Sequence, residues 1–482
     1  MIADLKPYPA MKDSGVPWLG EVPEHWEQRA LWTLSILRIE RNPGDLPLLS
    51  VFLNRGVIRY EEGGGQVHAP SLDLTNYQVV HSGDFVLNNQ QAWRGSVGVS
   101  RHHGIISPAY IVLQLTERLD TTFANYLVRC PAMVDQFVAA SKGVGDIQRQ
   151  IYWPYLRVVR VPFPPLSEQC AIAHFLDHMD RRIRRYIRAK QKLIKLLEEQ
   201  KQAIIHRAVT RGLDPNARLK PSGVEWLGDV PEHWELRHLK SLVRRIDQGV
   251  SPQAENYLAD GAAWGVLKAG CVNRGVFKEG EHKRLPAGFA FDPVLAVAAG
   301  DVLVSRASGS PNLVGSVGRV PSLKYKLILS DKTFRPVFNQ DVDPDFMVLA
   351  MNSRYYRQQV EQAISGAEGL ANNLPLSSLR AFVFVIPPAE EQRTIIEYLR
   401  KATEELRATL VHAEREISLL REYRTRLIAD VVTGKLDVRE AAARLPEETE
   451  APETLDEIGD DETQEGESGN DLDEAMTSEA GD

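Results

Sequence analysis

Residues 164–214 read PPLSEQCAIAHFLDHMDRRIRRYIRAKQKLIKLLEEQKQAIIHRAVTRGLD, and residues 387–437 read PPAEEQRTIIEYLRKATEELRATLVHAEREISLLREYRTRLIADVVTGKLD. The Pro-Pro, Glu-Gln and Leu-Asp pairs of the first stretch return in the second at a constant shift of 223 residues. Neither stretch contains Pro or Gly between its opening prolines and the closing Gly212 or Gly434. Because a helix tolerates proline in its first turn and often ends at glycine, each stretch is predicted to form one long helix.

Apolar residues recur at steps of three and four along both predicted helices. They are Leu176, Met179, Ile183, Ile187, Ile194, Leu197, Ile205 and Ala208 in the first helix, and Leu399, Ala402, Leu406, Leu410, Ala413, Ile417, Leu420, Leu427 and Val431 in the second. This spacing is typical of a coiled-coil seam, and about 44 residues at 1.5 Å each make a rod of roughly 66 Å. The two helices are predicted to pair with each other, and the alternative is that each is a solvated amphipathic helix.

A shorter repeat stands before each variable part of the chain. Residues 14–26 read SGVPWLGEVPEHW and residues 222–234 read SGVEWLGDVPEHW, with eleven identities in thirteen positions. Glycine and proline punctuate the segment, so it is predicted to be a connector whose tryptophans need burial. It is interpreted either as a linker anchored within the fold or as a docking surface for a partner, and both interpretations can hold together.

The two variable blocks, residues 27–163 and 235–386, are predicted to be one duplicated and diverged β-rich domain. Shared motifs support the duplication: Gly83-Asp84 and Gly300-Asp301, and GSVG at 95–98 and 315–318. In the first block, strands are predicted over Leu48–Leu53, Phe85–Leu87, Ser96–Val99, Tyr110–Leu115 and Val158–Phe163, and a helix over Thr122–Ala140.

The predicted fold class is α+β, with two β-rich domains separated by two long antiparallel coiled-coil helices in an internal pseudo-two-fold repeat. The predicted order is linker 1–26, domain 27–163, helix 164–214, linker 215–234, domain 235–386, helix 387–445 and tail 446–482. Because the linker after the first helix matches the linker before the first domain, this order is cyclic. The end of the second helix is therefore expected near the N-terminus.

The net charge of −8 hides a basic body. Residues 446–482 hold sixteen Asp or Glu and no Lys or Arg, which leaves 57 basic residues against 49 acidic ones elsewhere. This tail is predicted to be disordered. We expect it to be inert and solubilising, the alternative being electrostatic competition with an anionic partner.

Cysteine usage and hydropathy point to the cytoplasm. Cys130, Cys170 and Cys271 lie far apart without CxxC spacing, which argues against disulfides and zinc. The N-terminus lacks the apolar core of a signal sequence, and no apolar run is long enough to cross a bilayer. We therefore expect no membrane association.

Motifs for catalysis are missing from the sequence. It contains no GxxxxGK[ST] phosphate loop, GxGxxG turn, HExxH or GxSxG motif, and no Asn/Asp-Pro-Pro-aromatic site for a flipped base. His102-His103, with His81, could suggest a metal site, but loop histidines are more often hydrogen-bonded or solvated. The chain is predicted to have no catalytic residues, no metal and no cofactor of its own.

Polar, glycine-rich loops are abundant in both variable blocks. Arg, Asn, Gln and Ser side chains can read base edges, and glycine lets the backbone approach phosphate, so these loops are candidates for binding DNA. The alternative is that they are solvated loops. The candidates are Asn89, Gln90, Gln91, Arg94, Arg101, His102, His103, Lys142, Gln148, Arg149 and Gln150 in the first block, with 141–150 predicted as a loop, and Arg306, Ser308, Ser310, Asn312, Asn372 and Asn373 in the second.

The paired helices opened by PPLSEQ and PPAEEQ, the WLGEVPEHW and WLGDVPEHW linkers and the cyclic order together resemble the specificity subunit of type I restriction–modification systems. The resemblance covers residues 1 to about 445. It implies that each domain is a target-recognition domain reading one half of a split double-stranded DNA sequence, while the helices set the unread spacer. It also implies a non-catalytic subunit that serves DNA methylation and phage defence.

The resemblance further implies partners. Two methyltransferase subunits, which carry S-adenosylmethionine, would dock on the conserved regions, and restriction subunits would join them. The implied docking residues are Trp18, Trp26, Glu168, Gln169, Trp226, Trp234, Glu391 and Gln392. The first helix is strongly basic and the second is near balance, which departs from two equal docking sites. Alternatives are a coiled-coil scaffold whose domains bind proteins, or the specificity subunit of a methylase-only or phage-exclusion system.

Overall fold

The computed structural model describes residues 5–42, 44–53, 55–63, 70–71, 73–144, 148–261, 263–364 and 372–446. The predicted acidic tail lies outside these residues, apart from Pro446. The chain divides into two compact units. The first unit is Met1–Ala189 with Glu416–Asp482, and the second is Lys190–Arg415.

Elements of the first unit are β1 (Met11–Asp13), β2 (Glu21–Pro23), β3 (Glu27–Ala30), β4 (Ser35–Leu37), β5 (Leu49–Phe52), β6 (Gly56–Arg59), β7 (Gln78–Val80), β8 (Asp84–Asn88), β9 (Val97–Val99), β10 (Gly104–Ile106), β11 (Tyr110–Leu115), α1 (Thr121–Arg129), α2 (Pro131–Ala139), β12 (Ser141–Val144), β13 (Gln148–Ile151), α3 (Trp153–Leu156), β14 (Arg160–Phe163) and α10 (Arg439–Ala443). Elements of the second unit are β15 (Leu219–Pro221), β16 (Asp229–Pro231), β17 (Glu235–His238), α5 (Leu239–Leu242), β18 (Val243–Gln248), β19 (Trp264–Leu267), β20 (His282–Arg284), β21 (Val302–Ser305), β22 (Ala307–Ser308), β23 (Val317–Arg319), β24 (Lys326–Ile328), β25 (Thr333–Phe338), α6 (Pro344–Ala350), α7 (Arg354–Ala363), β26 (Asn372–Asn373), α8 (Leu376–Ala381) and β27 (Val383–Ile386). The two long helices are α4 (Leu166–Arg211) and α9 (Ala389–Val432).

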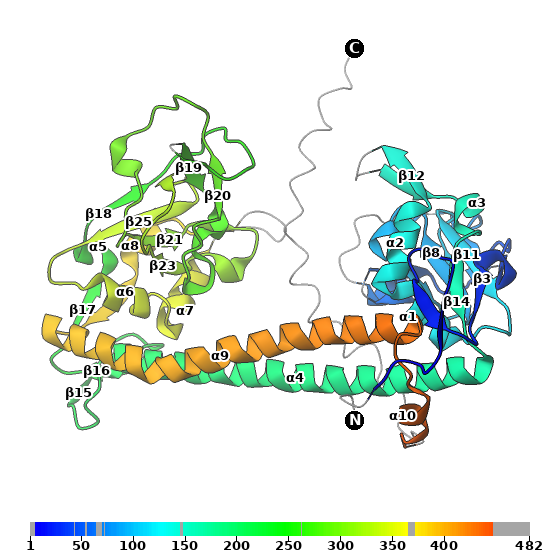
Figure 1. The fold of residues 1–482 in the computed structure, drawn as a ribbon. Helices are drawn as coiled ribbons and strands as arrows, with labels where there is room; N and C mark the ends of the chain where they lie inside the picture. The colour runs from blue at the N-terminus through cyan, green and yellow to red at the C-terminus, as the bar shows by residue number, and fades with distance from the viewer. Residues whose placement is uncertain are drawn as a thin grey trace, which may run out of the picture. The chain divides into compact units, whose positions relative to one another are not determined.

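An antiparallel four-stranded sheet with the order β4-β11-β8-β9 forms the centre of the first unit. Figure 1 labels its two inner strands, β11 and β8. Its middle strand β8 is buried on both faces because successive side chains point to opposite sides of a strand. Phe85 and Leu87 belong to the same core cluster as Phe123 of α1 and Phe137 of α2. Val86 faces the other way, into a smaller cluster with residues of the β5–β6 hairpin.

The second unit repeats this sheet in the order β18-β25-β21-β23. Val304 of β21 shares a core cluster with Phe346 of α6 and Tyr355 of α7. Leu303 points into a separate cluster beside the sheet β20-β19-β24. Two sheets with the same strand order, each covered by a pair of helices in the same chain position, confirm the predicted α+β fold with an internal repeat.

The linkers form matching hairpins, β1–β2 and β15–β16. After each hairpin the chain enters a strand that pairs with the last strand of the same domain, as β3 with β14 and β17 with β27. The first and last strands of a domain therefore lie side by side. This pairing brings the linker tryptophan to the start of the long helix.

In each unit, the beginning of one long helix packs against the end of the other. Phe175, Leu176 and Met179 of α4 share the first unit's core with Leu427 and Val431 of α9. Ile205, Ala208 and Val209 of α4 share the second unit's core with Ile395 and Leu399 of α9. The helices are thus antiparallel where they meet. The predicted apolar positions are buried or half-buried throughout the seam.

The N-terminal segment meets the segment that follows α9, as the cyclic order predicts. The backbone N–H of Asp437 donates to the carbonyl of Lys6 at 2.8 Å. In Figure 1, the blue N-terminal strands and the orange-red end of α9 with α10 accordingly belong to one unit.

Two local predictions for the first unit were wrong. The helix predicted over 122–140 is two helices, because Cys130 precedes Pro131 and takes an extended conformation at ψ 147°. The loop predicted over 141–150 is instead the hairpin of β12 and β13, paired from Ser141↔Ile151 to Val144↔Gln148.

None of the described helices has the combination of length and apolar character needed to span a membrane. Burial raises the pKa of the Cys130 thiol to about 11 and that of Cys271 to about 12, which keeps both protonated and unreactive near neutral pH.

The C-terminal end of α9 leaves little room for a side chain at Gly434. Gly434 has φ +80°, and a Cβ there would contact Pro23 and lie 2.9 Å from Trp26 Cζ3. We predict that Gly434→Ala costs about 1–2 kcal/mol for left-handed backbone and a further 1–3 kcal/mol, roughly, for overpacking. The measurement is hydrogen exchange of the last turns of α9.

Gly15→Ala is the matched control. Gly15 has φ +67°, and among the described residues no atom lies within 4 Å of the place that a Cβ would take. This variant should show the backbone cost alone. Equal losses in the two variants would mean that Pro23 and Trp26 move aside freely.

Candidate functional sites

Glu168, in the first turn of α4, is the centre of a cluster of hydrogen bonds that also includes Tyr8, His25, Trp26 and Gln169. We call this cluster the first linker node. The buried carboxylate of Glu168 accepts hydrogen bonds from Tyr8 Oη, from His25 Nε2 at 2.7 Å and from Trp26 Nε1 at 3.1 Å. A negative charge is also favoured at the N-terminal end of a helix. Burial, followed by the hydrogen bond to Glu168, raises the pKa of Tyr8, so the phenol stays a donor.

Gln169, the next residue of α4, belongs to the same node and bonds three backbone groups. Its Oε1 accepts from the backbone N–H of Asp120 at 2.8 Å, and its Nε2 donates to the carbonyls of Arg118 at 3.1 Å and Pro164 at 2.9 Å. The side chain is fully buried, so these three backbone groups have no access to water in its place. One glutamine therefore joins the end of β14, the start of α4 and the turn before α1.

The second unit repeats this arrangement, which we call the second linker node. Glu391 accepts from His233 Nε2 at 2.8 Å and from Trp234 Nε1 at 3.0 Å. Gln392 accepts from the backbone N–H of Asp343 at 2.7 Å and donates to the carbonyls of Asp341 and Pro387 at 3.1 and 2.9 Å.

Most of the predicted docking residues therefore lie inside the fold. Trp26, Gln169, Trp234 and Gln392 are fully buried, and the side chain of Glu168 is 5% exposed. Trp18 and Trp226 are half-buried, and Trp226 stacks on Tyr355 with ring centroids 6.1 Å apart. These residues hold the linkers onto the helices, and a role in binding a partner stays a prediction.

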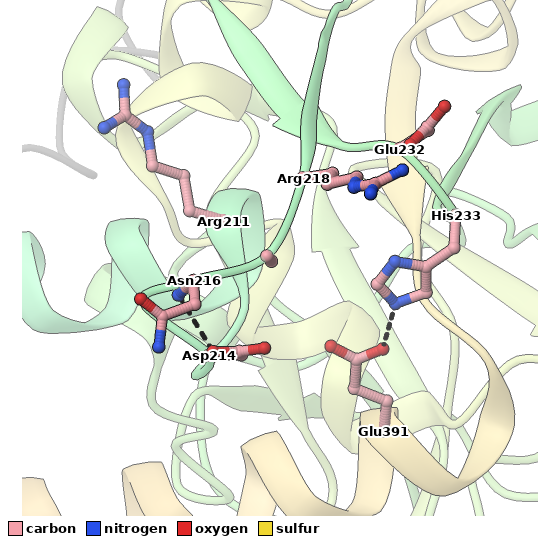
Figure 2. Close-up of a pocket in the computed structure, with 8 residues that line it drawn as sticks. Arg211, Asp214, Asn216, Arg218, Glu232, His233 and Glu391 are labelled. Carbon is pink, nitrogen blue, oxygen red and sulfur yellow. Dashed lines mark hydrogen bonds and ion pairs between the residues drawn. The ribbon is translucent and has the colours of Figure 1, made fainter.

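A pocket of about 570 Å³ opens beside the second linker node (Figure 2). It is lined by Arg211, Asp214, Asn216, Ala217, Arg218, Glu232, His233 and Glu391. Figure 2 shows the end of α4 and the following linker on one side, with His233 directed onto Glu391 on the other. The Glu391 side chain is 29% exposed, in contrast to Glu168.

In the first unit, the structure brings two of the three predicted DNA-binding stretches together. The backbone N–H of Ile151, at the end of the β12–β13 hairpin, donates to the carbonyl of Asn89 at 2.8 Å. The guanidinium groups of Arg94 and Arg149 lie 4.6 and 5.8 Å from the ring centroid of Trp93. Residues 89–94 and the hairpin therefore form one polar surface, to which Gln90, Gln91 and Lys142 add exposed side chains and Gln150 a half-buried one.

The third stretch, Arg101–His103, lies elsewhere. It follows β9, which pairs with β8 in antiparallel register, so it reaches the opposite end of these strands from Asn89. His103 contacts the carbonyl of Val80 at 3.2 Å and packs 4.7 Å from the ring of His81. The backbone of Gln148 belongs to β13, while its side chain lies outside the described residues.

In the second unit, the structure brings all six predicted residues together. Ser308 pairs with Asn372 and Ala307 with Asn373 between β22 and β26. The N–H of Leu374 donates to the carbonyl of Arg306 at 2.8 Å, the counterpart of the Ile151–Asn89 bond. Ser310 and Asn312 follow directly along the same loop.

Exposed aromatic residues on the first surface were missed from the sequence. Tyr152 and Tyr155 are exposed, and Tyr155 accepts a hydrogen bond from Lys142, whose Nζ lies 4.0 Å from its ring centroid. Aromatic rings interleaved with arginine and lysine are typical of surfaces on which bases stack. The signal was present in NNQQAWR and RQIYWPY, where aromatic residues stand close to an arginine.

Comparison with known proteins finds similarity to proteins of one kind. No family model matches it. It is 28% identical over 228 residues to the EcoEI specificity subunit of a type I restriction enzyme from Escherichia coli, covering 46% of this chain and 38% of that protein. It is 23% identical over 444 residues to the putative type I restriction enzyme MjaX specificity subunit of Methanocaldococcus jannaschii, covering 87% of this chain and 96% of that protein.

A solved structure shares the fold. It is described as "Structural basis underlying complex assembly and conformational transition of the type I R-M system", and the match has a TM-score of 0.61 at 17% identity, covering 86% of this chain and 99% of that one. The resemblance predicted from the repeated motifs is thus confirmed: the chain is similar to specificity subunits of type I restriction enzymes. It spans less than two fifths of the first relative and nearly all of the second.

Gln169→Ala should loosen the first linker node. It removes the partners of three buried backbone groups, each worth roughly 1–3 kcal/mol when left unsatisfied, and partial relaxation should bring the total to about 2–4 kcal/mol. Amides around Asp120 should then exchange with solvent at least about 30-fold faster.

Gln200→Ala is the control, an exposed glutamine on the same helix. It should leave exchange near Asp120 unchanged. Unchanged exchange in Gln169→Ala as well would show that water replaces the amide without cost.

Proposed function

We propose that this chain is the specificity subunit of a type I restriction–modification complex. In this proposal each domain reads one half of a bipartite double-stranded DNA target, and the chain recruits methyltransferase and restriction subunits. The observation that carries the proposal is the recurrence of one polar loop-and-strand surface at the same place on two sheets of the same strand order. The similarity to specificity subunits over 87% of the chain supports it.

The chemistry of the two surfaces suits DNA. Arg and Asn side chains can form paired hydrogen bonds with base edges in the major groove, and Lys and Arg neutralise phosphates. The first surface combines Arg94, Lys142 and Arg149 with aromatic rings, whereas the second offers Arg306 with serine and asparagine. Because the two surfaces carry different side chains, the two half-sites should differ in sequence.

The chain's own part is recognition and assembly. Methyl transfer would use S-adenosylmethionine held by the methyltransferase subunits, and cleavage would belong to the restriction subunits. α4 and α9, of 46 and 44 residues, would set the unread spacer between the half-sites. At 1.5 Å per residue such helices are roughly 65–70 Å long.

Exchanging residues 27–163 for the same domain of a related protein should change one half-site and leave the other unchanged. The measurement is genome-wide mapping of methylated sites in cells that also contain the cognate methyltransferase. Exchange of residues 235–386 is the reciprocal control and should alter the other half. Simultaneous change of both halves would refute one-domain, one-half reading.

Lys142→Ala with Arg149→Ala should weaken DNA binding by the assembled complex without releasing the methyltransferase. Loss of two phosphate contacts reduces the slope of log K against log salt by roughly 1.8. The measurement is a salt titration of binding to a cognate duplex.

Arg29→Ala with Arg160→Ala is the matched control. It removes the same charge from the paired strands β3 and β14, away from the hairpin. The same slope change in both variants would show that only overall charge matters.

A further inference from the structure

The first linker node is completed by two separate chain segments. One carries Tyr8, which is 4% exposed and donates to Glu168. The other carries Arg439, whose guanidinium pairs with Asp437 at 2.7 Å and lies 5.0 Å from the Tyr8 ring centroid. The hydrogen bond to Asp437 raises the pKa of Arg439. The phenol of Tyr8 is therefore bonded to the carboxylate of Glu168, and the guanidinium of Arg439 lies over the phenol ring.

At the second linker node, one continuous segment that carries both Asp214 and Asn216 takes the place of these two segments. The shift of 208 residues that aligns the two linkers places Asn216 at the position of Tyr8, and the shift of 223 places Asp214 at the position of Asp437. Among the described residues no hydrogen bond joins Asn216 to Glu391, whereas Tyr8 donates to Glu168. The 570 Å³ pocket of Figure 2 lies in this place.

One oxygen of the Glu391 carboxylate, Oε2, accepts both of the hydrogen bonds from the linker. His233 and Trp234 both donate to Oε2, whereas in the first node Tyr8 and Trp26 share Oε1 of Glu168 and His25 takes Oε2. Within the described residues, Oε1 of Glu391 accepts no hydrogen bond. A carboxylate offers about four lone-pair positions, so this oxygen can accept from a further donor.

The rest of the lining carries unpaired charge. No ion pair forms to Arg211 or Arg218 within the part of the chain that the structure describes. The carboxylate of Asp214 accepts from the backbone N–H of Asn216 at 2.9 Å and stands where Asp437 binds its arginine. The volume lies within the range of pockets that hold small ligands or side chains.

We propose that this pocket receives a tyrosine from an extended segment of a partner polypeptide, with its hydroxyl donating to Oε1 of Glu391. A basic residue close to that tyrosine would pair with Asp214, as Arg439 pairs with Asp437. The inference rests on the proposed function for the nature of the partner, a subunit that docks on this chain. The first node is filled by the chain itself and the second is open, so the two docking regions of the repeat are not equivalent.

The probe is a fluorescein-labelled peptide of residues 5–12, LKPYPAMK, compared with the same peptide carrying Phe in place of Tyr. Fluorescence anisotropy is measured with the full chain. The tyrosine peptide should bind about tenfold more tightly than the phenylalanine peptide, since a hydrogen bond to a charged group contributes roughly 1.5–3 kcal/mol. Glu391→Gln should remove most of this difference.

Two variants control the assay. Glu390→Gln removes an exposed charge from the same helix turn and should leave both affinities unchanged. Asn216→Tyr should fill the pocket from within the chain and block the peptide, with the fold checked by circular dichroism. Equal affinity for the two peptides, equal effects of Glu390→Gln and Glu391→Gln, or no binding at millimolar peptide would each overturn the proposal.

The assay contains neither DNA nor a methyltransferase. Failure of the peptide to bind would therefore refute the tyrosine pocket and leave DNA reading untouched. Unaltered half-sites after domain exchange would refute the proposed function while the peptide result still stood.

Discussion

A carboxylate in the first turn of each long helix, buried in Glu168 and partly exposed in Glu391, is the contact on which the rest of each unit depends. Trp26 and Trp234 are fully buried, and an indole N–H without an acceptor would be costly there. Glu168 and Glu391 supply that acceptor from the first helical turn. The linker, the helix and the paired first and last strands of the domain therefore meet at one place. A change at the start of the helix therefore alters the hydrogen bonds that hold the linker.

A second constraint is electrostatic and differs between the units. Asp84 and Asp301 stand in the shared Gly-Asp motif, and each is neutralised by arginine. In the first unit Arg38, next to β4, binds Asp84 through two hydrogen bonds of 2.7 and 3.0 Å. In the second, Arg335 of β25 bridges Asp301 at 2.9 Å and Asp247 at 2.8 Å. Burial alone would lower the pKa of Arg335, but its hydrogen bonds to these carboxylates raise it.

The repeats predicted the architecture because they constrain it at several levels together. A fixed shift of 223 residues with an unbroken apolar period predicts two equal helices, and the cyclic order predicts that the N-terminus meets the end of the second. The β12–β13 hairpin was missed because SKGVGDIQRQ has glycine and polar residues where a strand pattern would alternate. The distance between Arg101–His103 and the other candidates depends on strand register, which composition does not encode.

The linker repeat can now be explained largely by packing and backbone geometry. The two positions at which the copies differ, Pro17/Glu225 and Glu21/Asp229, are exposed in both units, whereas Leu19/Leu227 and Val22/Val230 are buried. The paired glycines Gly15/Gly223 and Gly20/Gly228 all adopt positive φ, between 64° and 72°, where other residues are strained. Internal geometry is therefore sufficient to fix most of the eleven identities. Evidence for a partner must come from groups that packing leaves unused, and at the second node Oε1 of Glu391 is such a group.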